Sequence, residues 1–185
     1  MNYPDYNSCC ELLHKYDVPE HIIEHSCQVA LISLCLGEGL AVQGIDFNRD
    51  LLLSAGLLHD IAKMASIENG RDHAIMGAEW LELEGLPEIA EIVRNHVRLE
   101  TNLDGPLVAK EIIYYADKRV RHVEIVSVAE RLLDLRSRYG TNSSSLTNLD
   151  KLKDLTLGVE KKIFKNLDFS PEEVLQRCQG KNLLT

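Results

Sequence analysis

Helical periodicity runs through nearly all of the 185 residues and limits the folds open to this chain more than any other feature. Apolar residues recur every three or four positions, and we find no alternating β-branched runs of the kind that form half-buried strands. A chain of this length buries a sizeable core without help from disulfides. We therefore predict one all-α domain.

Proline, glycine and capping residues indicate where the helices begin and end. Pro19, for example, fits the first turn of a helix that places Ile22, His25 and Leu36 on one face. The predicted helices cover Tyr6 to Lys15, Pro19 to about Gly37 or Gly39, Asp46 (as N-cap) to Leu58, Asp72 to Gly85, Pro87 to His96, and Pro106 to about Arg138.

The last quarter of the chain has a different composition. Gly140 to Asn148 is rich in Ser, Thr and Asn, which predicts a loop. A helical pattern returns from Leu149 to Leu167, and Ser170-Pro171-Glu172-Glu173 resembles a capping box that opens a last short helix. We find no repeat and no domain linker, so we expect one domain over residues 1–140 and a helical extension, residues 141–185, packed on it.

The net charge of −9 argues against a nucleic acid polymer as a partner, because a polyanion is repelled at long range. No run of Lys and Arg supplies a local basic patch. A small phosphorylated ligand remains compatible with this charge, since a bound metal inverts the local potential.

Membrane insertion and secretion are not expected. No apolar run approaches the roughly 20 residues of a membrane span, and the first ten residues lack the pattern of a signal peptide. The five cysteines are odd in number and include no C-x-x-C pair, which is typical of reduced thiols in a cytoplasmic protein. Cys27 and Cys35 fall in an apolar helix, where they are expected to fill the core.

Several histidines and carboxylates stand in apolar helical surroundings. His25 lies on the apolar face of its helix, His59 and Asp60 end the most apolar helix, and Asp117 follows the run Ile112–Ala116. Burying a carboxylate there costs several kcal/mol unless it is paired or bound to a metal.

Each residue has a simpler explanation. A lone histidine on an apolar face is more often a hydrogen-bonded core residue, and Asp117 has Lys118, Arg119 and Arg121 nearby as ion-pair partners. These helices must nevertheless pack around one small core. A divalent cation would satisfy all their inward-pointing polar groups together.

These residues carry a family resemblance. His25, the segment Leu58–Lys63 (LHDIAK), His73, His96 and Asp117 resemble the H…HD…H…H…D pattern of HD-domain phosphohydrolases. HDIAK is similar to the HDIGK core of the HDIG subgroup, with Ala62 in place of Gly. The pattern spans Pro19 to about Val120. No Gly-Tyr-Pro element follows it, which disfavours the branch specific for cyclic di-GMP.

The resemblance implies a compact HD-domain helical bundle over residues 1–140, with its metal-binding core at about 19–120, and the C-terminal extension described above. It implies that His25, His59, Asp60 and Asp117 bind one metal, and that His73 and His96 complete a second site bridged by Asp60. Iron and manganese are the common metals of this family. Histidine and carboxylate ligands also suit zinc, nickel, cobalt or magnesium.

The implied reaction is hydrolysis of a phosphate ester or anhydride. Two cations about 3.5–4 Å apart supply a bridging hydroxide at neutral pH and clamp the phosphate. Asp60 and Lys63 are the predicted catalytic residues, with Lys63 contacting a substrate phosphate unless it is simply solvated. Arg98 and Arg119 are further candidates for phosphate contacts. His122 is expected near the mouth of the site but not as a ligand.

A stand-alone domain without a fused sensor favours a soluble, nucleotide-like substrate. A hydrolase of symmetrical dinucleoside tetraphosphates and a nucleotide phosphatase are the first choices, and oxidative chemistry with iron stays open. The protein is expected to be a monomer or a homodimer.

Two alternatives compete with this interpretation. His21-x-x-Glu24-His25 matches H-x-x-E-H, the zinc-binding helix of inverted-motif metallopeptidases. Such a peptidase would leave His59, Asp60, His73, His96 and Asp117 without a shared purpose. The second alternative is a non-catalytic HD-like ligand-binding module.

Overall fold

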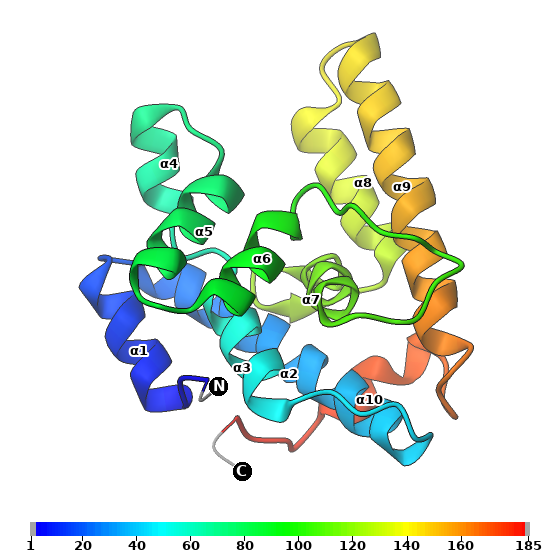
Figure 1. Cartoon of the computed structure of the whole chain (residues 1–185). Coiled ribbons are helices and arrows are strands. Elements are labelled where there is room, and N and C mark those ends of the chain that lie inside the picture. The colour runs from blue at the N-terminus through cyan, green and yellow to red at the C-terminus, as the bar shows by residue number, and fades with distance from the viewer. Residues whose placement is uncertain (1–2, 184–185) are drawn as a thin grey trace.

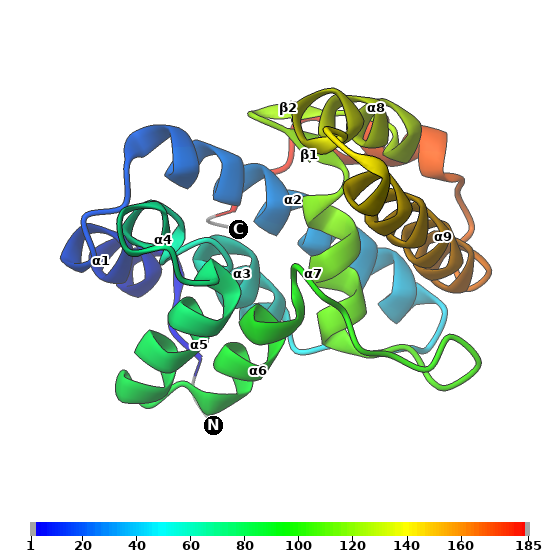
Figure 2. The same cartoon turned by 90° about the horizontal axis from the view of Figure 1, so that it is seen from above.

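The computed structural model describes residues 3–183 and confirms the all-α prediction (Figure 1). In chain order the elements are α1 (Tyr6–Lys15), α2 (Glu20–Val42), α3 (Arg49–Leu58), α4 (Lys63–Asn69), α5 (His73–Leu83), α6 (Pro87–Asn95), α7 (Ala109–Asp117), β1 (Val120–Arg121), β2 (Glu124–Ile125), α8 (Val128–Tyr139), α9 (Ser143–Phe164), the 3-10 turn η1 (Pro171–Glu173) and α10 (Val174–Cys178). Seen from above, α7 lies between the α4–α6 group and the α8–α9 pair (Figure 2).

The core forms where α2 crosses α3. A Cβ atom added to Gly56 would come within 2.6 Å of the Ala30 Cα atom, so only glycine permits this close approach of the two helices. Leu36 and Leu58 are fully buried around the crossing. Cys35 also lies in this core, as predicted, and is unpaired.

The predicted end of the second helix near Gly37 and Gly39 is wrong, because α2 continues to Val42. Both glycines serve packing instead. A Cβ atom at Gly37 would lie 2.5 Å from Leu52 Cδ1, and one at Gly39 would lie 2.7 Å from Phe169 Cε1. The chain leaves the helix before Gly44, which adopts a φ of +80°.

By length and composition, α2 also meets the requirements for crossing a membrane, contrary to the prediction that no segment would. In the fold, however, 61% of its apolar window is buried among the other helices. Within residues 3–183 it is therefore placed as the core helix of a folded domain.

Two further boundaries differ from the sequence prediction. Asn48, and not Asp46, caps α3 by accepting a hydrogen bond from Leu51 N at 3.0 Å. The region predicted as a loop up to Asn148 becomes helical from Ser143, because Asn142 accepts a hydrogen bond from Ser145 N at 2.9 Å and so starts α9.

The predicted long helix from Pro106 to Arg138 is interrupted. It divides into α7 and α8, with the antiparallel β1–β2 hairpin between them. Val120 pairs with Ile125, and their β-branched side chains favour strands. Ser127 then forms a capping box with Glu130 that begins α8. That box was a signal in the sequence that the helical periodicity obscured.

The C-terminal segment packs on the rest of the chain. Tyr114 of α7 shares a hydrogen bond of 3.0 Å with Thr156 of α9, and Lys162 Nζ donates to Glu111 Oε1 at 2.6 Å in a buried ion pair. Helix α10 lies against α2, and Ser170 and Glu173 form the predicted capping box before it. These contacts support the proposal that residues 141–185 are an extension of one domain.

Candidate metal centre

The six side chains of the H…HD…H…H…D pattern meet in one place, near the C-terminal end of α7. His25 lies in the second turn of α2, and His59 and Asp60 lie in the turn between α3 and α4. His73 begins α5, His96 follows α6, and Asp117 ends α7. Most of this cluster is buried, and only His73 is partly exposed.

Asp60 stands at the centre of the cluster and divides it. Its Oδ2 atom lies 3.4 Å from His59 Nε2 and 4.0 Å from His25 Nε2. Its Oδ1 atom lies 3.3 Å from His73 Nε2 and 3.4 Å from His96 Nε2. The result is two groups that share Asp60, and in each the ligand atoms lie within 4.8 Å of one another.

Asp117 closes the first group from the opposite side. Its Oδ1 atom lies 3.2 Å from His25 Nε2 and 3.8 Å from His59 Nε2. Side chains from α2, from the end of α3 and from α7 thus direct polar atoms at one point.

Backbone carbonyls orient three of the imidazoles. His25 Nδ1 lies 2.9 Å from the carbonyl oxygen of His122, His59 Nδ1 lies 2.8 Å from that of Gly56, and His96 Nδ1 lies 2.6 Å from that of Val93. A carbonyl oxygen only accepts, so each Nδ1 carries a proton, and each Nε2 is left facing the carboxylates of the cluster. This is the arrangement in which histidine binds metals.

His122 therefore contributes through its backbone. Its φ of 56° falls in the left-handed region, within the hairpin between β1 and β2. Its ring points elsewhere, with Nε2 accepting a hydrogen bond of 3.0 Å from Arg138. This placement agrees with the expectation that the ring is not a ligand.

Two buried atoms in the cluster test whether a cation fits. Among the described residues, His59 Nε2 and Asp60 Oδ1 find no hydrogen-bond partner, although His59 is fully buried and Asp60 is 2% exposed. Buried polar atoms are normally satisfied, and leaving them unpaired costs free energy. Both atoms offer lone pairs, so a cation between these side chains would satisfy them together. The residues fit a metal.

The electrostatics favour the ligand forms of both carboxylates and of His96. At His59, burial alone would lower the pKa, but Asp60 and Asp117 outweigh burial and raise it. Burial would raise the pKa of Asp60, but His59 and Lys63 outweigh burial and hold that pKa well below its usual range. Burial likewise opposes ionisation of Asp117, and Lys118 with His25 holds its pKa well below normal. Burial lowers the pKa of His96. The carboxylates are thus ionised and His96 is neutral, as metal ligands must be.

A lysine accompanies each carboxylate. Lys63 Nζ lies 2.6 Å from Asp60 Oδ2, and Lys118 Nζ lies 2.6 Å from Asp117 Oδ2 and 3.2 Å from the backbone oxygen of His96. Lys63 begins α4 instead of continuing α3, yet it remains within one turn of Asp60. Its side chain is 37% exposed, whereas Lys118 is buried. Both lysines line the same cleft, and Lys63 is the more exposed of the two.

The cluster opens into a cleft of about 810 Å³. Asp60, His73, His96 and Asp117 line one end, and side chains of α8 and α9 line the other. Arg98 also lines the cleft, is exposed, and has no ion-pair partner within residues 3–183. Its guanidinium is free to bind an anion.

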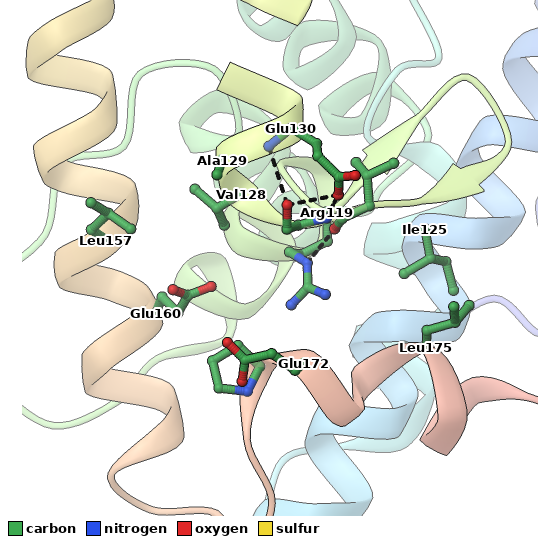
Figure 3. A pocket seen from close by; sticks show the side chains of 12 residues that line it. Arg119, Ile125, Val128, Ala129, Glu130, Leu157, Glu160, Glu172 and Leu175 are labelled. Atoms are coloured by element: carbon green, nitrogen blue, oxygen red, sulfur yellow. Dashed lines mark hydrogen bonds between the residues drawn. The ribbon is translucent and has the colours of Figure 1, made fainter. Parts of the chain in front are cut away.

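Arg119 is not brought to this cleft, although it was a candidate for phosphate contact. It lines a separate pocket of about 410 Å³ beside the start of α8 (Figure 3). Its Nε donates to the backbone oxygen of Val126 at 2.6 Å, and its Nη1 donates to the Tyr115 hydroxyl at 2.6 Å. Arg119 thus links Val126, the residue after β2, to Tyr115 of α7.

Arg131 lies in the cleft and was not predicted. Its Nη1 donates to Asp134 at 2.7 Å, while its buried Nε has no hydrogen-bond partner in the part of the chain that the structure describes. Recognising Ser127 as the start of a new helix would have placed Arg131, Leu135 and Tyr139 on one face of α8, since they are four residues apart.

The peptidase motif is not assembled. His21 and Glu24 are exposed on α2, whereas His25 is buried with its Nε2 toward Asp117. A zinc-binding helix of that kind would need both histidines at one metal.

Comparison with known proteins gives a family match that includes all six residues of the cluster. The HD domain family model matches residues 22–133, more than half of the chain. The chain is 30% identical over 95 residues to a tRNA (cytidine(56)-2′-O)-methyltransferase of Thermoplasma volcanium, covering 51% of this chain and 26% of that protein. It is 26% identical over 149 residues to an uncharacterized protein of Methanocaldococcus jannaschii, covering 73% and 87%.

A third relative carries a phosphodiesterase name. The chain is 30% identical over 139 residues to the dihydroneopterin 2′,3′-cyclic phosphate phosphodiesterase of Methanocaldococcus jannaschii, covering 68% of this chain and 54% of that enzyme. The chain thus spans about a quarter of the methyltransferase and about half of the phosphodiesterase. No solved structure gives a significant match.

Proposed function

Because this chain belongs to the HD domain family, we propose that it is a metal-dependent phosphohydrolase acting on an ester or anhydride of a small, nucleotide-like phosphate. One observation carries the proposal. Asp60 presents one carboxylate oxygen to His25 and His59 and the other to His73 and His96, with buried lone pairs left unsatisfied.

The proposed ligands form two sets. His25, His59, Asp60 and Asp117 would hold one metal, and Asp60 with His73 and His96 would hold a second. Iron and manganese are the first metals to test, since histidine–carboxylate sets accept several transition ions. When bound, the metal supplies a water-derived nucleophile at neutral pH and compensates charge on the phosphoryl oxygens.

The chain's own side chains would do the remaining work. Asp60 would be the shared ligand that positions both sets. Lys63, at the cluster and partly exposed, would bind a phosphoryl oxygen, and Arg98 would bind a second anionic group in the cleft. The carbonyl oxygens behind the histidines keep their Nε2 atoms directed at the cluster.

The phosphodiesterase relative supports a cyclic phosphodiester as the first substrate class to assay. Dinucleoside tetraphosphates and nucleoside monophosphates remain the candidates that the sequence itself suggested. A monomer or homodimer in the cytoplasm stays the working expectation.

The test combines metal content with activity. The purified chain is analysed for bound metals, then assayed with nucleoside 2′,3′-cyclic phosphates, nucleoside monophosphates and dinucleoside tetraphosphates. We expect bound transition metal and phosphoester cleavage that a chelator abolishes. Bound metal without any turnover would instead support a ligand-binding module, and oxygen-dependent product would support an oxygenase.

A further inference from the structure

The far end of the cleft is built by α8 and α9, and the metal ligands contribute nothing to it. The cleft-lining residues of α8 are Arg131, Leu135 and Tyr139, spaced four apart on one face. Those of α9 are Ser145, Asn148, Leu149 and Leu152, which also share a face. Both helices therefore turn one continuous stripe toward the cleft.

The charge of the cleft lining changes along α8 and α9. Arg131 lies near the start of α8, where the helix leaves the body of the protein, and Tyr139 ends the helix at the tip of the hairpin (Figure 1). Eight residues of helix separate them by about 12 Å. The charged side chains Lys63, Lys118 and Arg131 stand at the metal end, and the lining from Leu135 to Leu152 is uncharged.

Two polar side chains at the uncharged end, those of Tyr139 and Asn148, point to a ligand. Neither the Tyr139 hydroxyl nor the Asn148 side-chain amide makes a hydrogen bond within residues 3–183. Tyr139 is 58% exposed, so its ring is open to contact. An amide both donates and accepts, and an aromatic ring offers a face for stacking.

This end also lies outside the region shared with the family. The HD match ends at residue 133, before Leu135, Tyr139 and Asn148. The shared region thus contains the phosphate-directed charges. The segment beyond it supplies a surface that a phosphate alone would not reach.

We infer that the α8–α9 hairpin binds the planar heterocyclic base of the substrate, with Tyr139 stacking on the base and Asn148 hydrogen-bonding its edge. This inference rests on the proposed function, because it takes the phosphate to lie at the metal end. Leu135, Leu149 and Leu152 form the apolar side of the same subsite. Stacking tolerates any base, and the amide pairs with donor–acceptor edges.

Binding measurements with a matched ligand pair test this inference. Ribose 5-phosphate carries a hydroxyl group at C1′ where adenosine 5′-monophosphate carries the base, and both are titrated into the full chain loaded with Mn²⁺. We expect the nucleotide to bind about tenfold more tightly, because stacking and hydrogen bonding of the base add to its binding free energy. Guanosine, cytidine and uridine 5′-monophosphates extend the comparison to other bases.

Variants then assign the effect to residues. Y139A and N148A should each weaken nucleotide binding about five- to tenfold and leave ribose 5-phosphate within about twofold. Y139F keeps the ring and should retain most of the affinity. The controls L133A and T147A alter exposed neighbours on the same helices that do not line the cleft.

The outcomes separate this inference from the proposed function. Equal affinity for all four nucleotides and ribose 5-phosphate overturns it, as does undetectable nucleotide binding. It is also overturned if Y139A and N148A leave nucleotide affinity unchanged or weaken both kinds of ligand alike. Base-dependent binding without any hydrolysis would support the subsite while contradicting the proposed activity.

Discussion

His59 Nε2 lies 3.4 Å from Asp60 Oδ2, although the two residues are adjacent in the chain. Consecutive side chains on a regular α-helix point about 100° apart. Here α3 ends at Leu58, His59 caps it with helical dihedral angles (φ −58°, ψ −34°), and Asp60 follows in the turn that precedes α4. From this position Asp60 turns one carboxylate oxygen toward each histidine group.

Replacing Asp60 by asparagine should abolish metal binding while preserving the side chain's size. The amide carries no charge and is a weak ligand, so we expect at least about a 100-fold loss of metal affinity. Metal bound only to the folded state raises the unfolding temperature. We therefore expect added Mn²⁺ to raise the melting temperature of the original chain and not that of D60N. D150N, at an exposed carboxylate paired with Arg136, is the control. Full metal content in D60N would contradict the ligand assignment.

Replacing Lys63 by methionine should separate substrate binding from metal binding. The substitution keeps the apolar stem and removes the charge that lies 2.6 Å from Asp60. We expect elemental analysis to find unchanged metal and kcat/KM to fall about 10- to 100-fold, as for other lost charge-assisted contacts to a phosphate. K15M, at an exposed surface pair with Glu84, should leave kcat/KM unchanged. An unaltered kcat/KM in K63M would indicate a merely solvated lysine.

Replacing Lys162 by methionine should show that α9 belongs to the same folding unit as α7. Its partner Glu111 is fully buried and would be left as an uncompensated charge. We expect a loss of about 3–5 kcal/mol in the free energy of unfolding by urea denaturation. The double variant E111Q/K162M should recover part of that loss. K161M, one residue away and exposed, is the matched control, and equal stability of both single variants would refute the prediction.

The contact between Tyr16 and Glu84 should weaken at alkaline pH. Burial and the hydrogen bond to Glu84, 2.5 Å long, raise the pKa of Tyr16 to about 12. A raised pKa means that the neutral phenol is stabilised by folding. Its contribution is complete below the ordinary value of 10.0 and is lost as the pH rises to about 12.

Tyr16→Phe tests this directly. The ring that stacks on Trp80 is kept, with centroids 4.5 Å apart in the original chain, and only the hydroxyl is removed. Unfolding followed by the fluorescence of Trp80, the single tryptophan, should show the original chain more stable by about 1 kcal/mol below pH 10. That difference should disappear toward about pH 12. A difference that stays constant over this range would rule out the assigned titration.

The sequence was most reliable where one local rule acts alone. Asp72 caps α5 and Pro87 begins α6, as predicted, because caps and proline act through their own backbone. It failed where packing decides. Gly37 and Gly39 look like helix ends in the sequence. They lie inside α2, where Leu52 and Phe169 occupy the space that a larger side chain would need.

By itself, the sequence determined the all-α class and the set of residues that carries the family pattern, since apolar spacing and residue identity are local properties. Only the tertiary structure decided which of these side chains meet. It turned His59 and Asp60 into one site through a turn, placed Arg119 in another pocket, and brought Arg131 and Tyr139 into the cleft. Those outcomes depend on helix ends and helix crossings, which are set by contacts between residues far apart along the chain.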